Sequence, residues 1–320
     1  MIEHTLDTFK IDSSITLDPY GKWQKETPHT FERGEAIAVL AALKIKRPLL
    51  VRGEPGCGKT QLARAAAQVL GMPMAQLVVN ERTETEDLFW RYDALRRLSD
   101  ANNPENNDLA DSQYLTPGPL WWALDHKTAG ELECNGLSCL DMGQGATKRQ
   151  YSNGVLLLID EIDKADRSVP NSLLEALDDY SFPVPYTGQT ISCESPEKRP
   201  LVIITTNGEQ QLPQAFVRRC LVLDIVLPKD EEEFVAKLTS RGQALFAERF
   251  DSHKTCSKVA KMLWRKRKEV ELGSSPYLPG QAEYLDHLAA ILAMKEFDPP
   301  TSEQDAIEQL APLAYGKNRE

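Results

Sequence analysis

A glycine-rich octapeptide at residues 53–60 sets narrow limits on how this chain can fold. It reads Gly-Glu-Pro-Gly-Cys-Gly-Lys-Thr and matches the pattern G-x-x-x-x-G-K-[ST] at every position. Because glycine has no Cβ, consecutive backbone N–H groups in such a loop can point inward around a chain of phosphates. Lys59 would reach the terminal phosphates, and the Thr60 hydroxyl would bind Mg²⁺. The octapeptide therefore predicts a nucleoside triphosphate site placed between a strand and a helix.

The segments on either side of the octapeptide meet that requirement. Residues 49–51 are a short apolar run, and residues 61–70 carry apolar side chains at helical spacing. The N-terminal end of such a helix bears a partial positive charge that favours phosphate. The alternative is a flexible glycine loop with a solvated lysine. The expected phosphate-binding residues are Gly53, Glu54, Pro55, Gly56, Cys57, Gly58, Lys59, Thr60 and Gln61.

Short apolar runs alternate with helical patterns over the first two thirds of the chain. The further expected strands are residues 75–79, 155–159, 201–205 and 221–226, and the further helices are residues 31–44 and 168–177. Ser168 is the expected N-cap of the last helix. Strands that alternate with helices in this way indicate an α/β fold of three αβα layers around a mostly parallel sheet.

The last third of the chain has only helical signals. Helices are expected at residues 231–250, 254–270, 280–295 and 304–310. We therefore predict three parts: an N-terminal leader at residues 1–30, an αβα domain at residues 31–228, and a small all-α domain at residues 229–320.

Composition narrows the classes of partner. The chain has 320 residues, and its 37 basic and 48 acidic side chains leave a net charge of −11. This balance argues against non-specific wrapping of duplex DNA, although a locally basic channel stays open. Apolar runs are far shorter than the ~18 residues of a membrane-spanning helix. The six cysteines show no disulfide framework, so a reduced, cytoplasmic protein without a membrane partner is expected.

Two carboxylates follow the apolar run at residues 155–159. Asp160 fits the role of holding Mg²⁺, and Glu161 fits the role of a general base for the attacking water. The alternative is a pair of solvated acids in a turn. Asp163 and Asp166 are expected to be charges at a helix N-terminus rather than functional groups.

Polar residues also follow the next strand along the chain. Asn207 would lie beside Asp160 in a parallel sheet and position the water, and its alternative role is to form a turn before Gly208. Arg218 and Arg219 precede the strand at residues 221–226. They would stabilise charge on a transferred phosphoryl group, in cis or from a neighbouring subunit. Their alternative is an exposed cationic helix end.

Taken together, these motifs resemble those of AAA+ ATPases, and more narrowly of MoxR-like members. Residues 53–60 resemble Walker A, residues 156–161 Walker B, residues 205–207 sensor 1, and residues 212–219 an arginine-finger segment. The stretch at residues 114–120 resembles the Gly-Pro-Leu element of MoxR-like proteins. The resemblance implies a P-loop NTPase domain followed by a helical lid, with ATP and Mg²⁺ as the nucleotide and metal.

The resemblance also implies partners. Such proteins form homo-oligomeric rings, usually hexamers, in which ATP lies between subunits and Arg219, with Arg218 beside it, acts on the neighbour's nucleotide. Hydrolysis then remodels a client protein, and many members work beside a protein with a von Willebrand factor A domain. Two departures stand out: Gln281 occupies the place of a sensor-2 arginine, and the insertion at residues 131–153 is long. Residues 182–196 resemble a pre-sensor hairpin, in which Tyr186 is a pore-loop candidate or a packed turn residue.

Two other functions stay open. The missing sensor-2 arginine suits a nucleotide-gated switch or scaffold with slow turnover. The tetrapeptide at residues 160–163 also resembles the D-E-x-D motif of nucleic-acid helicases, so nucleic acid is not excluded as a partner. A helicase would need a second α/β domain, and the helical last third does not predict one.

Overall fold

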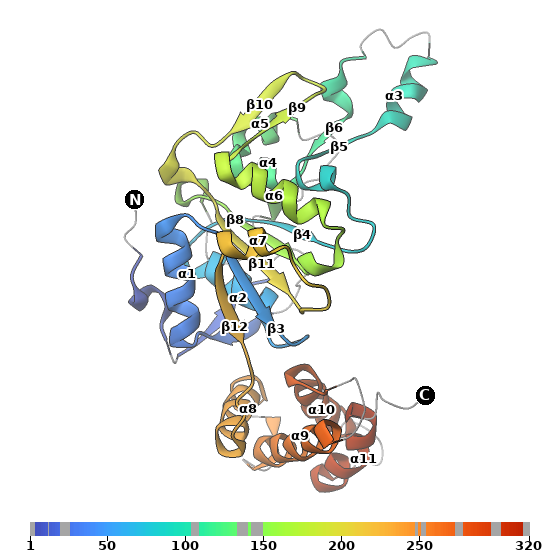
Figure 1. Cartoon of the computed structure of the whole chain (residues 1–320). Coiled ribbons are helices and arrows are strands. Elements are labelled where there is room, and N and C mark those ends of the chain that lie inside the picture. The colour runs from blue at the N-terminus through green and yellow to red at the C-terminus, as the bar shows by residue number, and fades with distance from the viewer. Residues whose placement is uncertain are drawn as a thin grey trace. The chain divides into compact units, whose positions relative to one another are not determined.

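The chain folds into two compact units in a computed structural model (Figure 1). The first unit comprises Met1–Arg52 and Lys59–Asp224, and the second comprises Gly53–Gly58 and Ile225–Glu320. The structure describes residues 4–11, 13–19, 26–103, 109–132, 140–141, 150–246, 249–250, 254–272, 278–295 and 302–315.

The elements of the first unit alternate between strand and helix as expected. They are β1 (Ser14–Leu17), β2 (Thr27–Thr30), α1 (Arg33–Ile45), β3 (Leu49–Gly53), α2 (Lys59–Val69), β4 (Met74–Val78), β5 (Trp90–Tyr92), α3 (Ala94–Ala101), β6 (Leu115–Pro117), α4 (Pro119–Leu124), α5 (His126–Glu131), β7 (Leu140–Asp141), β8 (Leu156–Asp160), α6 (Ser168–Asp179), β9 (Ser181–Val184), β10 (Gln189–Ser192), β11 (Leu201–Thr206), α7 (Gln214–Arg219) and β12 (Leu221–Ile225).

A six-stranded sheet forms the centre of this unit, in the order β12-β3-β11-β8-β4-β7. β11 pairs in parallel with both β3 and β8, β8 pairs in parallel with β4, and the short β7 is antiparallel at the edge. The register places Ile204 beside Ile159 and Val78 beside Asp160. Because neighbouring strands run the same way, the polar residues after β8 and β11 meet at one edge of the sheet.

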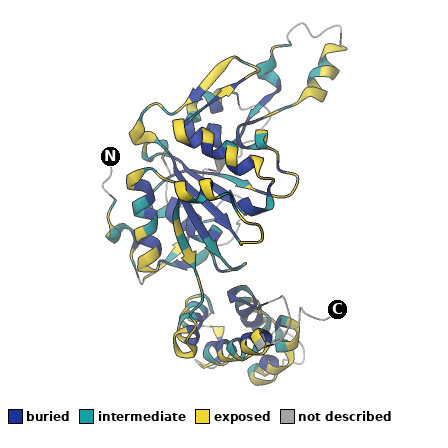
Figure 2. Cartoon of the chain, in the orientation of Figure 1, coloured by how far each residue is buried: buried dark blue, intermediate teal, exposed yellow. Residues whose placement is uncertain are grey.

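Helices cover both faces of the sheet, which buries the central strands completely (Figure 2). From β8, Leu157 and Ile159 join an apolar cluster with Trp121 of α4 and Leu173 of α6. Helix α2 contacts β8 and β11, and α1 contacts β11. The three-layer α/β fold with a mostly parallel sheet is therefore confirmed.

The start of α6 differs from the sequence expectation. Ser168 is the first residue of the helix rather than its N-cap, and its backbone N–H donates to the Asp166 carboxylate over 2.9 Å. This hydrogen bond lowers the pKa of Asp166. Asp166 thus satisfies an N–H group that the helix itself leaves without a partner, which is why the serine is not needed as a cap.

The expected leader contains ordered structure among its described residues. β1 pairs antiparallel with β2, and the Gln68 side chain of α2 donates to the Thr16 carbonyl over 2.8 Å. Phe9 packs edge-on against Phe31 with ring centroids 5.0 Å apart. These contacts fasten the segment to the first unit, while the predicted boundary between residues 30 and 31 stays a prediction.

The second unit is built from four helices among its described residues: α8 (Glu231–Phe246), α9 (Thr255–Leu272), α10 (Gln281–Met294) and α11 (Glu303–Tyr315). Phe234, Leu263, Tyr284 and Leu288 belong to its core. In the described residues, none of the helices combines the length and apolar character that a membrane crossing needs. A C-terminal helical region is therefore confirmed, while the predicted boundary between residues 228 and 229 stays a prediction.

His287 joins α10 to α11 in this core. One of its ring nitrogens, Nε2, lies 3.1 Å from the Ile307 carbonyl, which can only accept, so Nε2 carries the proton. The other, Nδ1, therefore accepts from the Tyr315 hydroxyl over 2.9 Å. Burial lowers the pKa of His287 to about 4, so the folded unit holds a neutral imidazole.

Candidate nucleotide site

Three elements of the first unit bring predicted site residues to one edge of the sheet. Helix α2 begins with Lys59 and Thr60, β8 ends at Asp160, and Asn207 follows β11. Residues separated by 100 and 148 positions along the chain thereby come into hydrogen-bond contact. The sequence reasoning predicted this meeting because parallel strands end at the same edge.

Thr60 and Asp160 form the predicted metal-binding pair. The Thr60 hydroxyl lies 2.9 Å and 3.0 Å from the two carboxylate oxygens of Asp160. Asp160 is buried, so its charge is poorly hydrated and favours a cation or donor partner. An aliphatic hydroxyl beside a carboxylate offers the oxygen donors that Mg²⁺ prefers, and the residues present therefore fit that ion.

Thr205, which the sequence analysis placed in the stretch resembling sensor 1 without a role of its own, makes two contacts in the site. Its fully buried hydroxyl donates to Asp160 Oδ1 over 2.7 Å and accepts the backbone N–H of Glu161 over 2.8 Å. The same hydroxyl thus orients the carboxylate of one predicted functional residue and the backbone of the next. A threonine two residues before Asn207, at the end of an apolar strand, was the available signal.

Glu161 has an unusual backbone conformation. Its φ of 62° and ψ of 47° lie in the left-handed region, which is uncommon for a residue with a side chain. Such conformations persist where surrounding contacts hold them, and they concentrate at functional sites. The hydrogen bond from the Glu161 N–H to Thr205 is one of these contacts.

The Glu161 carboxylate is engaged on both oxygens. Lys164 Nζ lies 2.7 Å from Oε2, and Asn207 Nδ2 donates to Oε1 over 3.3 Å. The hydrogen bond to Glu161 raises the pKa of Lys164. Lys164 is half-buried, one turn after Glu161, and the sequence reasoning assigned it no role. These contacts place a cation beside the predicted general base.

Asn207 connects the lysine of the octapeptide to the acidic pair. Its Oδ1 accepts from Lys59 Nζ over 2.7 Å, while its Nδ2 reaches Glu161. Lys59 itself is buried. The amide therefore has both of its ends in the candidate site, while its role in positioning water stays a prediction.

Asp163 contradicts the expectation of a mere helix-terminal charge. It is buried, and its carboxylate accepts the backbone N–H groups of Asn207 over 3.4 Å and Glu209 over 2.9 Å. Such charge-assisted bonds hold the segment after β11 against the turn after β8. The sequence offered no signal for this contact because it spans 44 and 46 positions.

The two arginines are exposed at the end of α7. Arg219 forms an ion pair with Asp178 over 3.1 Å, with both side chains about half exposed. The Arg47 side chain donates to the Arg218 and Arg219 backbone carbonyls, which are the carbonyls that a helix C-terminus leaves without partners. The helix end is therefore fixed, while Arg218 is exposed and the Arg219 guanidinium is half-exposed beside Asp178.

The rest of the octapeptide belongs to the second unit. Of its residues, Gly56 and Gly58 have φ angles of 73° and 103°, which an L side chain rarely adopts. Gln61, in the first unit, donates from Nε2 to the Pro28 carbonyl over 3.2 Å. The phosphate-binding role of all nine predicted residues stays a prediction.

Tyr186 and Gln281, which the sequence analysis also singled out, lie outside the cluster of predicted site residues. Tyr186 lies in the turn between the antiparallel strands β9 and β10 and stacks on Tyr92 with ring centroids 3.9 Å apart. The Tyr186 side chain is nevertheless exposed, so both alternatives stay predictions. Gln281 is buried as the first residue of α10. The insertion at residues 131–153 lies largely outside the described residues.

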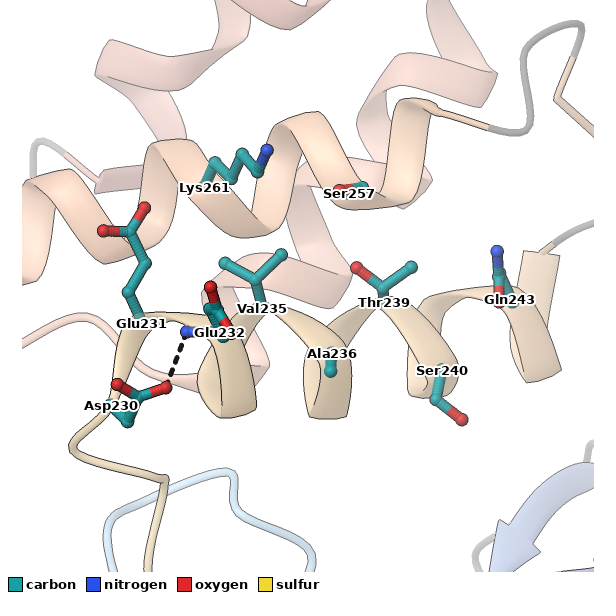
Figure 3. Close-up of a pocket in the computed structure, with 10 residues that line it drawn as sticks. All are labelled: Asp230, Glu231, Glu232, Val235, Ala236, Thr239, Ser240, Gln243, Ser257 and Lys261. Carbon is teal, nitrogen blue, oxygen red and sulfur yellow. Dashed lines mark hydrogen bonds between the residues drawn. The ribbon is translucent and has the colours of Figure 1, made fainter.

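A groove of about 790 Å³ lies between α8 and α9 of the second unit (Figure 3). Its acidic end includes Asp230, but that carboxylate already accepts the backbone N–H groups of Glu232 and Glu233 at the start of α8. None of the predicted site residues lines it. The groove is therefore separate from the candidate site, and its acidic end serves as a helix cap.

Comparison with known proteins identifies a family. Residues 48–220, more than half of the chain, match the family described as AAA domain (dynein-related subfamily). Midasin of Giardia intestinalis is 24% identical over 213 residues, which cover 63% of this chain and 4% of that protein. Midasin of Dictyostelium discoideum is 25% identical over 189 residues, which cover 58% of this chain and 3% of that protein. The chain thus spans a small fraction of either midasin.

A solved crystal structure is also similar. It is that of a proposed ATPase from Cytophaga hutchinsonii ATCC 33406, and the match covers 87% of this chain and 78% of that one, at 15% identity and a TM-score of 0.38.

Proposed function

The chain belongs to the AAA domain family, in its dynein-related subfamily, and on this premise we propose that it hydrolyses ATP. The observation that carries the proposal is the cluster of Lys59, Thr60, Asp160, Glu161 and Asn207 at one edge of the sheet. A phosphate-binding lysine, oxygen donors for a metal, a carboxylate base and an amide are the parts that phosphoryl transfer to water needs.

Thr60 and Asp160 would hold Mg²⁺ through their oxygen atoms. When bound, the ion neutralises charge on the phosphates of the nucleotide. Thr205 fixes the Asp160 carboxylate by the 2.7 Å hydrogen bond, so the donors are oriented before the metal arrives. Lys59 would neutralise charge on the terminal phosphate oxygens.

Glu161 and Asn207 would activate the water. The water oxygen attacks the γ-phosphorus, the bond from that phosphorus to the oxygen of ADP breaks, and Glu161 accepts the proton that the water loses. Asn207 would orient the water through its amide. Lys164 pairs with Glu161 Oε2, so Oε1, the oxygen on the side of Asn207, would take the proton.

The test is the variant Glu161→Gln. It should bind ATP with wild-type affinity and lose more than about a hundredfold in the rate of phosphate release, since the base is removed while the nucleotide contacts stay. Glu175→Gln, at an exposed position of α6, is the matched control. Undiminished hydrolysis by Glu161→Gln would refute the assigned role.

We further propose that the protein is a MoxR-like remodelling ATPase that works as a homo-oligomeric ring, expected to be a hexamer. Support comes from the half-exposed Arg219 at the fixed end of α7, which would exchange its surface ion pair with Asp178 for a neighbouring subunit's nucleotide. The client is a protein, and a von Willebrand factor A domain protein is the expected partner type. Molecular mass in solution tests the ring, using Glu161→Gln with Mg²⁺ and ATP to hold the nucleotide.

A nucleotide-gated switch is the second candidate. It is favoured by one observation, the ion pair of Lys164 with the proposed base, which would slow hydrolysis while leaving nucleotide binding intact. A persistent monomer that binds ATP and turns over less than about once a minute would support the switch over the ring. Strong stimulation of hydrolysis by DNA or RNA would instead favour the helicase alternative.

A further inference from the structure

Arg267 is a buried arginine in helix α9 of the second unit. It is 7% exposed, and its guanidinium donates to both carboxylate oxygens of Glu54, over 3.0 Å and 2.9 Å. It also donates to the Pro279 carbonyl over 2.6 Å. Since a guanidinium stays charged, burying it requires hydrogen-bond acceptors of this kind. A bidentate ion pair with a carboxylate is among the strongest of these interactions.

The partner of Arg267 belongs to the glycine-rich octapeptide. Glu54 is the second residue of that loop, and the Gly53–Gly58 segment is part of the second unit. Its neighbour Gly56 lies so close to α10 that a Cβ built there would fall 2.4 Å from the Ala282 Cβ. The helical unit therefore holds the loop at two points, by an ion pair from α9 and by close packing from α10.

We infer that Arg267 is a positioning residue for nucleotide binding: through Glu54 it holds the phosphate-binding loop, and it thereby links the order of α9 to nucleotide occupancy. The inference rests on the proposed function, because it takes the loop to bind nucleotide. Arg267 acts through a carboxylate rather than by touching phosphate.

Coupling of this kind is reciprocal. If the ion pair holds the loop in its binding conformation, then a bound nucleotide must in turn stabilise the ion pair and α9. Removing either partner therefore has two measurable effects. Nucleotide binding becomes weaker, and bound nucleotide no longer stabilises α9. A contact that serves only to stabilise the fold would change neither of these in a variant that stays folded.

The variants Glu54→Gln, Arg267→Met and the double variant test the inference. Glu54→Gln removes the charge of the pair but keeps a side-chain oxygen that can accept a hydrogen bond from Arg267, which is why it is the milder of the two changes. Arg265→Met, at an exposed position of the same helix, is the matched control. The probe is fluorescently labelled ADP with Mg²⁺, and circular dichroism verifies that each variant is folded.

Glu54→Gln and Arg267→Met should each raise the Kd for ADP about tenfold, within the 5- to 150-fold range typical of coupled sites. The double variant should bind no more weakly than Arg267→Met alone, because both changes break the same contact. Arg265→Met should bind as the wild type does. Additive losses in the double variant would overturn the inference.

Hydrogen exchange supplies the second measurement. Saturating ADP should slow amide exchange in peptides from α9 of the wild type and Arg265→Met, and leave it unchanged in Glu54→Gln and Arg267→Met. Wild-type affinity together with a wild-type response in Glu54→Gln would overturn the inference and leave the proposed function standing. A wild-type protein that fails to bind ADP or ATP would overturn the proposed function, and the inference with it.

Discussion

Replacing Thr205 by valine tests the internal architecture of the candidate site. Valine has nearly the same shape, so the change opens no cavity and removes only the hydroxyl. That hydroxyl donates to Asp160 over 2.7 Å and accepts from the Glu161 N–H over 2.8 Å, in a fully buried position. Both partners therefore lose a hydrogen bond at once.

The expected loss in the free energy of unfolding follows from these two hydrogen bonds. A hydrogen bond to a charged group contributes about 1.5–3 kcal/mol, and a buried N–H left without a partner costs about 1–3 kcal/mol. Glu161 is only partly buried, so water relieves some of the second cost, and we expect Thr205→Val to lower the free energy of unfolding by about 3 kcal/mol. Thr205→Ser keeps the hydroxyl and loses one buried methyl group, which costs about 1 kcal/mol.

Urea denaturation followed by circular dichroism measures both free energies, and phosphate release measures activity. Because the Thr205 contact holds the left-handed backbone at Glu161, Thr205→Val should also lower kcat at least tenfold, while Thr205→Ser stays within about threefold. Equal stability of the valine and serine variants would refute the assignment, since it would mean that the hydroxyl does not carry these bonds.

Three further predictions concern different contacts. Asp163→Asn should lower kcat with little change in ATP affinity and destabilise the protein by about 2 kcal/mol, because a charged acceptor of two backbone N–H groups is lost; an unchanged kcat in steady-state assays would contradict this. Arg219→Ala mixed with Lys59→Ala should recover hydrolysis that neither variant has alone, since each subunit supplies what the other lacks; a mixture as inactive as its parts would show that Arg219 does not act in trans. His287 has a pKa lowered to about 4 in the folded protein against 6.5 unfolded, so the unfolded chain binds the extra proton and stability falls as the pH drops from 6.5 to 4, by about 3 kcal/mol in total. Urea denaturation of the wild type and His287→Gln between pH 7 and pH 4.5 measures that loss, which should be much smaller in the variant.

Much of the fold could be predicted because its signals are local. The apolar runs at β3, β4, β8, β11 and β12 are short and bounded, and the helices between them have clear periodicity. An error arose where two neighbouring residues could each supply the same cap. Helix α6 begins at Ser168 because the Asp166 side chain supplies its cap, which residue preference alone does not reveal.

Some residues of the candidate site could likewise be predicted from the sequence, and others could not. Lys59, Thr60, Asp160 and Glu161 are recognisable because phosphate and Mg²⁺ demand particular residue types at fixed spacing. Thr205 lies in the stretch that resembles sensor 1, and Asp163 closes the D-E-x-D tetrapeptide, but neither pattern predicts the partners of these two side chains. Lys164 belongs to no motif, because a lysine at this spacing suits any helix start.

The chain's sequence by itself determined the chemistry: a loop that can surround phosphates, carboxylates after a buried strand, and an amide after the next one. Only the tertiary structure decided how these groups are held. The parallel pairing of β8 with β11 sets Thr205 against Asp160, although 45 positions separate them, and the folding of the second unit sets Arg267 against Glu54 across 213 positions. Local preferences act over a few residues, whereas side-chain partners at these separations are chosen by strand register and helix packing.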